Sequence, residues 1–161
     1  MKLLMYSFFL LLLAPCNGAK KTASTDTSSD DLKTVSFAFE RTPCFGNCPY
    51  FEMTITGATK TVVYKGKRNV SKMGEFHKSI SEKEIKALMD AFDKAKFFEF
   101  KDQYTAKVTD LPTTYVTYAV NGKSKKVEDY YNAPAELKNL EKLLDEIANS
   151  EGWEQSDSSD H

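Results

Sequence analysis

The sequence predicts an α+β fold, in which an antiparallel sheet carries two helices packed on one face, a two-layer sandwich with the element order ββββαββα. Three observations predict it. Four short segments in the first half alternate apolar with polar residues, two longer segments repeat apolar residues at helical spacing, and an Asn-Gly pair joins two more strand-like segments. Short links between successive strands favour an antiparallel meander.

Each expected strand of the first half has one buried face. Val35, Phe37 and Phe39, for example, alternate with smaller or polar residues, which is the two-residue period of a strand. The segment 42–49 interrupts this pattern with two prolines, a glycine and an asparagine, and therefore predicts a tight loop. The four strands are expected at residues 34–41, 50–56, 61–66 and 69–80.

A capping box begins the first helix, because the Ser81 hydroxyl can accept a hydrogen bond from the Glu84 amide while Glu84 reaches back. Apolar residues at helical spacing extend that helix to about Ala95, namely Ile85, Leu88, Met89 and Phe92. Three phenylalanines follow, and we expect them to dock the end of the helix on the sheet: Phe97, Phe98 and Phe100.

A hairpin and a second helix complete the domain. After an irregular loop at 101–112, strands are expected at 113–120 and 123–131 around Asn121-Gly122, because a type I′ turn needs positive φ at both positions. Pro134 suits the first turn of the last helix. The apolar stripe of that helix consists of Leu137, Leu140, Leu143, Leu144 and Ile147.

The N-terminus predicts export. Lys2 precedes a mostly apolar run at 3–13, which matches the charged and hydrophobic regions of a bacterial signal peptide. The run is shorter than the roughly 20 residues that span a bilayer. Cleavage before Cys16 would expose a cysteine for lipidation, as in a lipoprotein box, although a proline replaces the usual small residue before it. Cleavage after Gly18 or Ala19 would instead release a soluble secreted protein.

The chain therefore divides into four expected segments: a signal peptide at 1–15, a flexible tether at 16–32, a single α+β domain at 33–149 and an acidic tail at 150–161. The tail is expected to fray, with Trp153 packing back on the domain. A small, polar tether suits a domain held off a membrane by an N-terminal lipid. We expect a lipid-anchored protein of the cell envelope, in the periplasm or at the outer membrane, or alternatively a soluble secreted protein.

Composition argues against several classes of function. The chain has 22 Lys and Arg against 23 Asp and Glu, and this near-neutral balance does not suggest binding to nucleic acid. It has no phosphate-binding glycine loop and no dinucleotide fingerprint, so we expect no cofactor. His77 is expected on the solvent face of its strand, where one histidine makes neither a metal site nor a catalytic triad.

Cys44 and Cys48 form an even pair, separated by three residues. They can be bridged if the loop brings their Cα atoms within about 7 Å, and disulfides persist in oxidising compartments. A structural disulfide that pins the loop is the favoured interpretation. A redox-active dithiol stays an alternative, although Pro49 and a strand follow the pair instead of a helix N-terminus that would lower a thiol pKa.

Most carboxylates fall in helical segments, where solvated faces are expected: Glu82, Glu84, Asp90, Asp93, Glu136, Glu141, Asp145 and Glu146. Asp110 and Asp129 differ, because they lie before one strand of the hairpin and at the end of its partner, and therefore at the same end of the sheet. A hydrolase would need a cleft between these two carboxylates. The favoured role of Asp110 is to bind amides of its own loop.

Four motifs carry a family resemblance: R-T-P-C-F-G-N-C-P at 41–49, V-Y-K-G at 63–66, T-D-L-P-T-T at 109–114 and E-D-Y-Y-N-A-P at 128–134. They resemble an uncharacterised family of exported bacterial domains, described only as a domain of unknown function, many of whose members look like lipoproteins. The resemblance covers roughly residues 34–148. It implies export and a single domain, and it supplies no activity, substrate or catalytic residue.

The favoured hypothesis is a monomeric, non-catalytic envelope module that binds a protein, peptide or glycan, with no metal and no catalytic residues. Loops that a disulfide pins hold exposed side chains well, and the candidate binding surface comprises Arg41, Phe45, Asn47, Asp110, Thr113, Asp129 and Tyr131. The alternatives are an exported enzyme, either a thiol oxidoreductase using the cysteine pair or a hydrolase using Asp110 and Asp129, and a secreted inhibitor, by analogy of fold alone.

Overall fold

The structure is a computed structural model that describes residues 29–156. The predicted signal peptide, Cys16, most of the predicted tether and residues 157–161 lie outside the described residues. The helices are α1 (Ser29–Thr34), α2 (Glu82–Lys94), the 3-10 helix η1 (Phe97–Glu99) and α3 (Ala135–Asn149). The strands are β1 (Ser36–Arg41), β2 (Tyr50–Thr56), β3 (Thr61–Arg68), β4 (Gly74–Ser79), β5 (Gln103–Tyr104), β6 (Thr114–Val120), β7 (Lys123–Asp129) and β8 (Glu154–Gln155).

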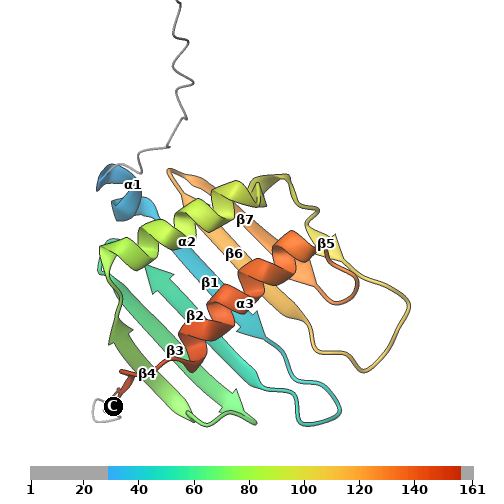
Figure 1. The fold of residues 1–161 in the computed structure, drawn as a ribbon. Coiled ribbons are helices and arrows are strands. Elements are labelled where there is room, and N and C mark those ends of the chain that lie inside the picture. Colours follow the sequence, from blue (N-terminus) through green and yellow to red (C-terminus); the bar gives the residue numbers. More distant parts are fainter. Residues whose placement is uncertain (1–28, 157–161) are drawn as a thin grey trace, which may run out of the picture.

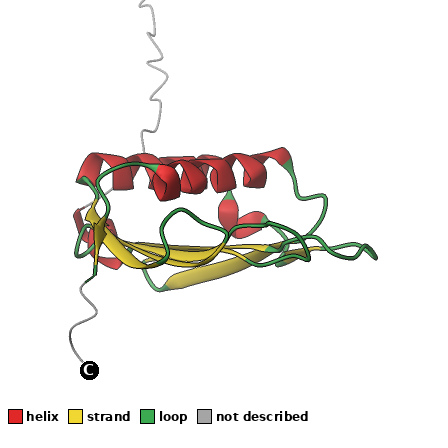
Figure 2. Ribbon diagram, turned by 90° about the horizontal axis from the view of Figure 1, so that it is seen from below, coloured by secondary structure: helices red, strands yellow, loops and turns green. Residues whose placement is uncertain are grey.

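One sheet contains all eight of these strands, in the order β5-β7-β6-β1-β2-β3-β4-β8. Every neighbouring pair is antiparallel except β5 with β7, which is parallel. The long helices α2 and α3 lie across one face of this sheet (Figure 1), and the other face has no helix on it among residues 29–156 (Figure 2). The predicted α+β two-layer architecture is therefore confirmed.

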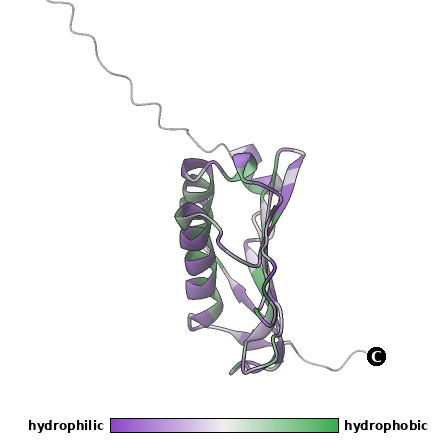
Figure 3. Cartoon of the chain, turned by 90° about the vertical axis from the view of Figure 1, so that its right-hand side faces the viewer, coloured by the Kyte–Doolittle hydropathy of each residue, from purple (hydrophilic) through white to green (hydrophobic). Residues whose placement is uncertain are grey.

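The core lies between the two layers, because each central strand turns its apolar parity toward the helices. Figure 3 shows the two layers edge-on, with hydrophobic colouring on the helix surfaces that face the sheet. Aromatic rings fill the centre: the rings of Phe37 and Tyr118 stack with centroids 5.0 Å apart, and Phe92 of α2 lies 4.9 Å from both. Phe97 of η1 packs against Phe92, so the expected docking of the helix exit is confirmed.

The capping box and the hairpin turn that the sequence predicted are both confirmed. Ser81 and Glu84 form the predicted capping box, with the Glu84 amide donating to Ser81 Oγ at 3.2 Å and the Ser81 amide donating to Glu84 Oε2 at 2.9 Å. Asn121 and Gly122 have φ values of 52° and 74°, the positive pair that a type I′ hairpin turn requires.

The N-terminal boundary of the ordered domain was predicted too far along the chain. The tether was expected to end at residue 32, but α1 begins at Ser29 and buries Leu32 against the core. Gly57 explains this docking, because a Cβ there would lie 2.3 Å from the Leu32 carbonyl oxygen, and its amide donates to Val35 O at 3.0 Å. The absent side chain lets the turn after β2 approach α1 closely.

Both edges of the sheet carry a short strand that the sequence did not predict. In the expected loop 101–112, the two residues of β5 pair with the end of β7, and the Tyr130 amide donates to Tyr104 O at 2.9 Å. In the expected tail, β8 pairs with β4, and the ring of Trp153 packs 5.5 Å from that of Tyr64. Two-residue strands have no periodicity, so no pattern could reveal them. The fourth strand is also shorter than expected and begins at Gly74.

Candidate functional site

The loop between β1 and β2 is held in place by covalent and polar contacts. A disulfide joins Cys44 and Cys48, whose Cα atoms are 5.6 Å apart, as the sequence predicted. The last residue of β3 and the residue after it support both halves, since Arg68 Nη2 donates to Cys44 O at 3.2 Å and Asn69 Nδ2 donates to Cys48 O at 3.2 Å. We call residues 42–49 the disulfide loop.

The residues just before β6 fix the first turn of this loop. The Thr42 amide donates to Thr113 O at 2.9 Å, and the Thr113 amide donates back to Thr42 Oγ1 at 2.8 Å. The disulfide loop and the segment 108–113 are therefore tied side by side at one end of the sheet.

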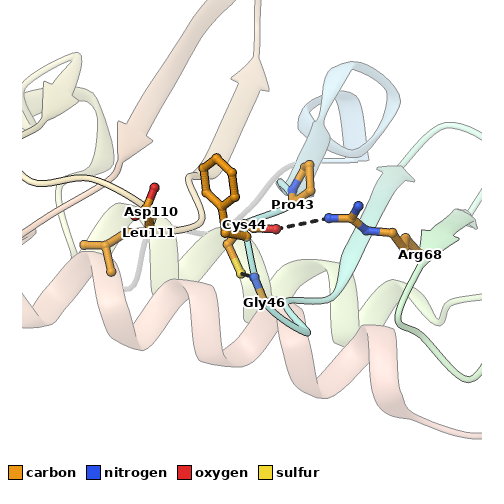
Figure 4. A pocket seen from close by; sticks show the side chains of 7 residues that line it. Pro43, Cys44, Gly46, Arg68, Asp110 and Leu111 are labelled. Atoms are coloured by element: carbon orange, nitrogen blue, oxygen red, sulfur yellow. Dashed lines mark hydrogen bonds between the residues drawn. The ribbon is translucent and has the colours of Figure 1, made fainter.

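A pocket of about 500 Å³ lies between these two segments (Figure 4). The disulfide loop contributes Pro43, Cys44, Phe45 and Gly46, β3 contributes Arg68, and the loop before β6 contributes Asp110 and Leu111. Phe45 is 93% exposed and Leu111 40% exposed, so two large apolar side chains face solvent beside one another. Exposed apolar groups that gather at one place on a protein mark interaction sites.

The two charged residues of the pocket come from different segments and lie on opposite sides of Cys44 in Figure 4. Arg68 is exposed and forms no ion pair with a carboxylate in the part of the chain that the structure describes. Asp110, also exposed, has a backbone φ of 70° and no ion pair within residues 29–156. We call this the disulfide-loop pocket.

A partly buried ionic cluster lies between the same end of the sheet and α3. Arg41 continues the inward parity of β1, and its Nε donates to Asp145 Oδ1 at 3.1 Å while its Nη2 also pairs with Asp145. Its Nη1 donates to Thr114 Oγ1 at 2.8 Å. The guanidinium therefore joins β1 and β6 to α3 and anchors the strand end from which the disulfide loop departs.

Two carboxyl groups of this cluster are almost completely buried, Asp129 at the end of β7 and Glu141 on α3, each 3% exposed. Lys138 forms an ion pair with Asp129 and lies 3.4 Å from Glu141 Oε2. Burial, together with a hydrogen bond to Asp129, raises the pKa of Glu141 to about 7. Below about pH 7 Glu141 is therefore mostly protonated and can donate its proton in a hydrogen bond to Asp129.

The structure separates the residues of the predicted binding surface into two groups. Phe45, Asn47, Asp110 and Tyr131 are exposed, and of these Phe45 and Asp110 line the disulfide-loop pocket. Arg41 and Asp129 instead use their charges inside the ionic cluster, and Thr113 is partly buried in the contact with Thr42.

Other residues in and near the site were also missed or misplaced by the sequence analysis. Glu141 was expected on a solvated helix face but is buried, whereas Leu143 of the predicted apolar stripe is 36% exposed. Helical spacing contains the correct signal, because Glu141 lies four residues after Leu137 and three before Leu144, both buried. Arg68 and Leu111 carry no local signal, since only the fold brings them to the disulfide loop.

The geometry does not support the alternative of a hydrolase that uses Asp110 and Asp129 together. Asp110 lines the disulfide-loop pocket, but Asp129 is buried and paired with Lys138. His77 is on the outer face of β4, with Nε2 3.4 Å from Glu154 Oε2. Among residues 29–156 no group of three or more His, Cys, Asp or Glu side chains could hold a metal ion, and no helix there is long and apolar enough to cross a membrane.

A family model matches most of the described residues. The model of the family described as "Domain of unknown function (DUF6438)" matches residues 35–148, which include the disulfide loop, the segment before β6 and all but the last residue of α3. No match is found among curated proteins.

Proposed function

The chain belongs to the DUF6438 family, and we propose that it is an exported, lipid-anchored module of the cell envelope that binds a protein partner through the disulfide-loop pocket and catalyses no reaction. One observation carries this proposal: Phe45 presents a 93% exposed aromatic ring on a loop closed by a disulfide, beside the exposed Leu111. Aromatic side chains in such positions are frequent anchors of protein interfaces.

The rigidity of the loop supports binding. A loop backbone that is already fixed in its bound position loses little conformational freedom on association, which leaves more of the contact energy for affinity. Here the disulfide, the hydrogen bonds from Arg68 and Asn69, and the Thr42–Thr113 pair restrain the loop on both sides. The partly buried ionic cluster around Arg41 then holds the strand end beneath it.

Export and anchoring are supported by the leader sequence and by the cysteine pair. Lys2 and the apolar run at 3–13 have the character of a signal peptide, and Cys16 follows it. A disulfide between Cys44 and Cys48 suits an oxidising compartment.

We expect mass spectrometry of the protein from its own cells to find residues 1–15 removed and Cys16 carrying lipid. A Cys16→Ala variant provides the control, since it should leave the membrane fraction and lack the added mass. An unmodified N-terminus after residue 18 or 19 would contradict the lipid anchor and indicate a secreted protein.

Binding can be tested in living cells by placing a photo-crosslinking amino acid at position 45. We expect a discrete adduct with another protein at this position, because the side chain there is exposed beside an apolar pocket. Leu143 provides the control, since it is also a large apolar residue at the surface but lies on α3, where it lines a different pocket. The same adducts at both positions, or none at position 45, would contradict the proposal.

A further inference from the structure

We infer that the disulfide-loop pocket binds an extended peptide segment of its partner in which a large apolar residue stands between an acidic and a basic residue. This inference rests on the proposed function and names the partner chemistry of the same site. It comes from the arrangement of Phe45, Arg68 and Asp110 around one cavity.

The apolar part of the pocket sets the central residue of the ligand. Phe45 and Leu111 lie on the two segments that bound a space of about 500 Å³, and Pro43 adds a third apolar surface. These three surfaces match a hydrocarbon side chain, because removing such a side chain from water stabilises the contact.

Arg68 determines the charge that the ligand is expected to carry on one side of its central apolar residue. Its guanidinium uses one nitrogen to donate to Cys44 O, and no carboxylate within residues 29–156 pairs with it. The remaining N–H groups are available, and a guanidinium binds a carboxylate through two parallel hydrogen bonds. By contrast, the neighbouring Lys67 is already paired with Glu52.

Asp110 determines the charge that the ligand is expected to carry on the other side of that apolar residue. It belongs to the opposite segment of the pocket, and Figure 4 draws it across Cys44 from Arg68. It lies in the loop before β6 and has a left-handed backbone, with φ of 70°. Cation and anion on opposite sides match a ligand whose charges have the reverse order, and such complementarity also fixes the direction in which the ligand binds.

The test is selection of a phage-displayed library of random dodecapeptides on the full chain, purified in detergent. We expect enriched peptides with a large apolar residue flanked by Asp or Glu on one side and Lys or Arg on the other, always in the same direction. Phe45→Ala is expected to weaken the best peptide at least about thirtyfold, as for an interface anchor.

The charge variants separate the two sides. Arg68→Gln should remove the acidic preference while retaining the apolar residue, and weaken the best peptide by up to about fivefold, the range of an exposed ion pair. Asp110→Asn should remove only the basic preference, since asparagine accepts a positive φ. Lys67→Gln is the matched control, because it makes the same charge change at the adjacent residue and should leave the selected peptides unchanged.

Two results would overturn the inference: an acidic preference that persists in Arg68→Gln, or a library from which the wild-type chain selects nothing beyond what Phe45→Ala selects. If position 45 still crosslinks to a protein in cells, either result contradicts only the peptide chemistry inferred for the ligand, and the proposed binding of a protein partner is retained. If that crosslink is also absent, both fail.

Discussion

Replacement of Tyr118 by alanine is expected to lower the free energy of unfolding by about 3 to 5 kcal/mol, the usual cost of truncating a large buried aromatic residue. Tyr118 is 1% exposed and sits at the centre of the aromatic core, where it stacks on Phe37 and contacts Phe92 of α2. The alanine leaves a cavity between sheet and helices that rigid neighbours fill only in part. Urea denaturation followed by circular dichroism measures the difference.

Two variants show whether the loss comes from the core. Tyr118→Phe keeps the ring and removes only the hydroxyl that hydrogen-bonds Asp93, so its cost should be about 1 kcal/mol. Tyr115→Ala lies on the same strand but on the face without helices, beside Lys126, and should cost about 1 kcal/mol or less. Equal losses at positions 115 and 118 would contradict the two-layer core.

Acidification from pH 8 to pH 5 is expected to raise the free energy of unfolding by about 2 to 3 kcal/mol through Glu141. Its pKa is about 7 in the folded chain and near its ordinary value of 4.5 in the unfolded chain. The folded state therefore binds more protons between these two values, and stability is lost as the pH rises through 7. Chemical denaturation at a series of pH values measures this slope.

Glu141→Gln isolates the contribution of this group, because the amide mimics the protonated carboxyl beside Asp129, Lys138 and Arg41. The variant should be within about 1 kcal/mol of the wild type at pH 5 and about 3 kcal/mol more stable at pH 8. Glu146→Gln, on the exposed side of α3, should retain the wild-type slope. A wild-type stability that is constant from pH 5 to pH 8 would contradict the buried acid pair.

A different group of carboxylates acts at lower pH. The pKa of Glu82 is lowered by hydrogen bonds from Lys86 and Lys60, and that of Glu84 by hydrogen bonds from Ser81. Their contribution is present above the ordinary glutamate pKa and is lost as the pH falls below it. The gain from Glu141 is therefore expected to stop near pH 5 and to reverse in stronger acid.

The parts of the fold that the sequence predicted are those governed by local rules. Alternation in Phe37 and Phe39, the capping box at Ser81 and the turn at Asn121 each act within a few residues, and the structure confirms all of them. The elements that were missed depend on distant partners. Helix α1 needs Gly57, β5 needs the end of β7, and β8 needs the free edge of β4.

The candidate site shows the same division. Phe45 and the cysteine pair could be selected from the loop sequence, because a disulfide-closed loop with two prolines has few ways to bury an aromatic ring. Arg41 and Asp129 were expected on the exposed binding surface, but both continue the inward parity of their strands and face α3. The alternation of inward and outward residues along β1 and β7 could have indicated that Arg41 and Asp129 point inward. Their partners Glu141 and Asp145 could not be identified, because only the tertiary structure brings α3 to these strands.

The most direct test of the account is the affinity of the chain for the protein that crosslinks at position 45, measured by isothermal titration for the wild type, Phe45→Ala and Leu143→Ala. The account predicts at least about a thirtyfold loss for Phe45→Ala and less than about a twofold change for Leu143→Ala. Equal affinities for the wild type and Phe45→Ala would contradict the assignment of the disulfide-loop pocket as the binding site.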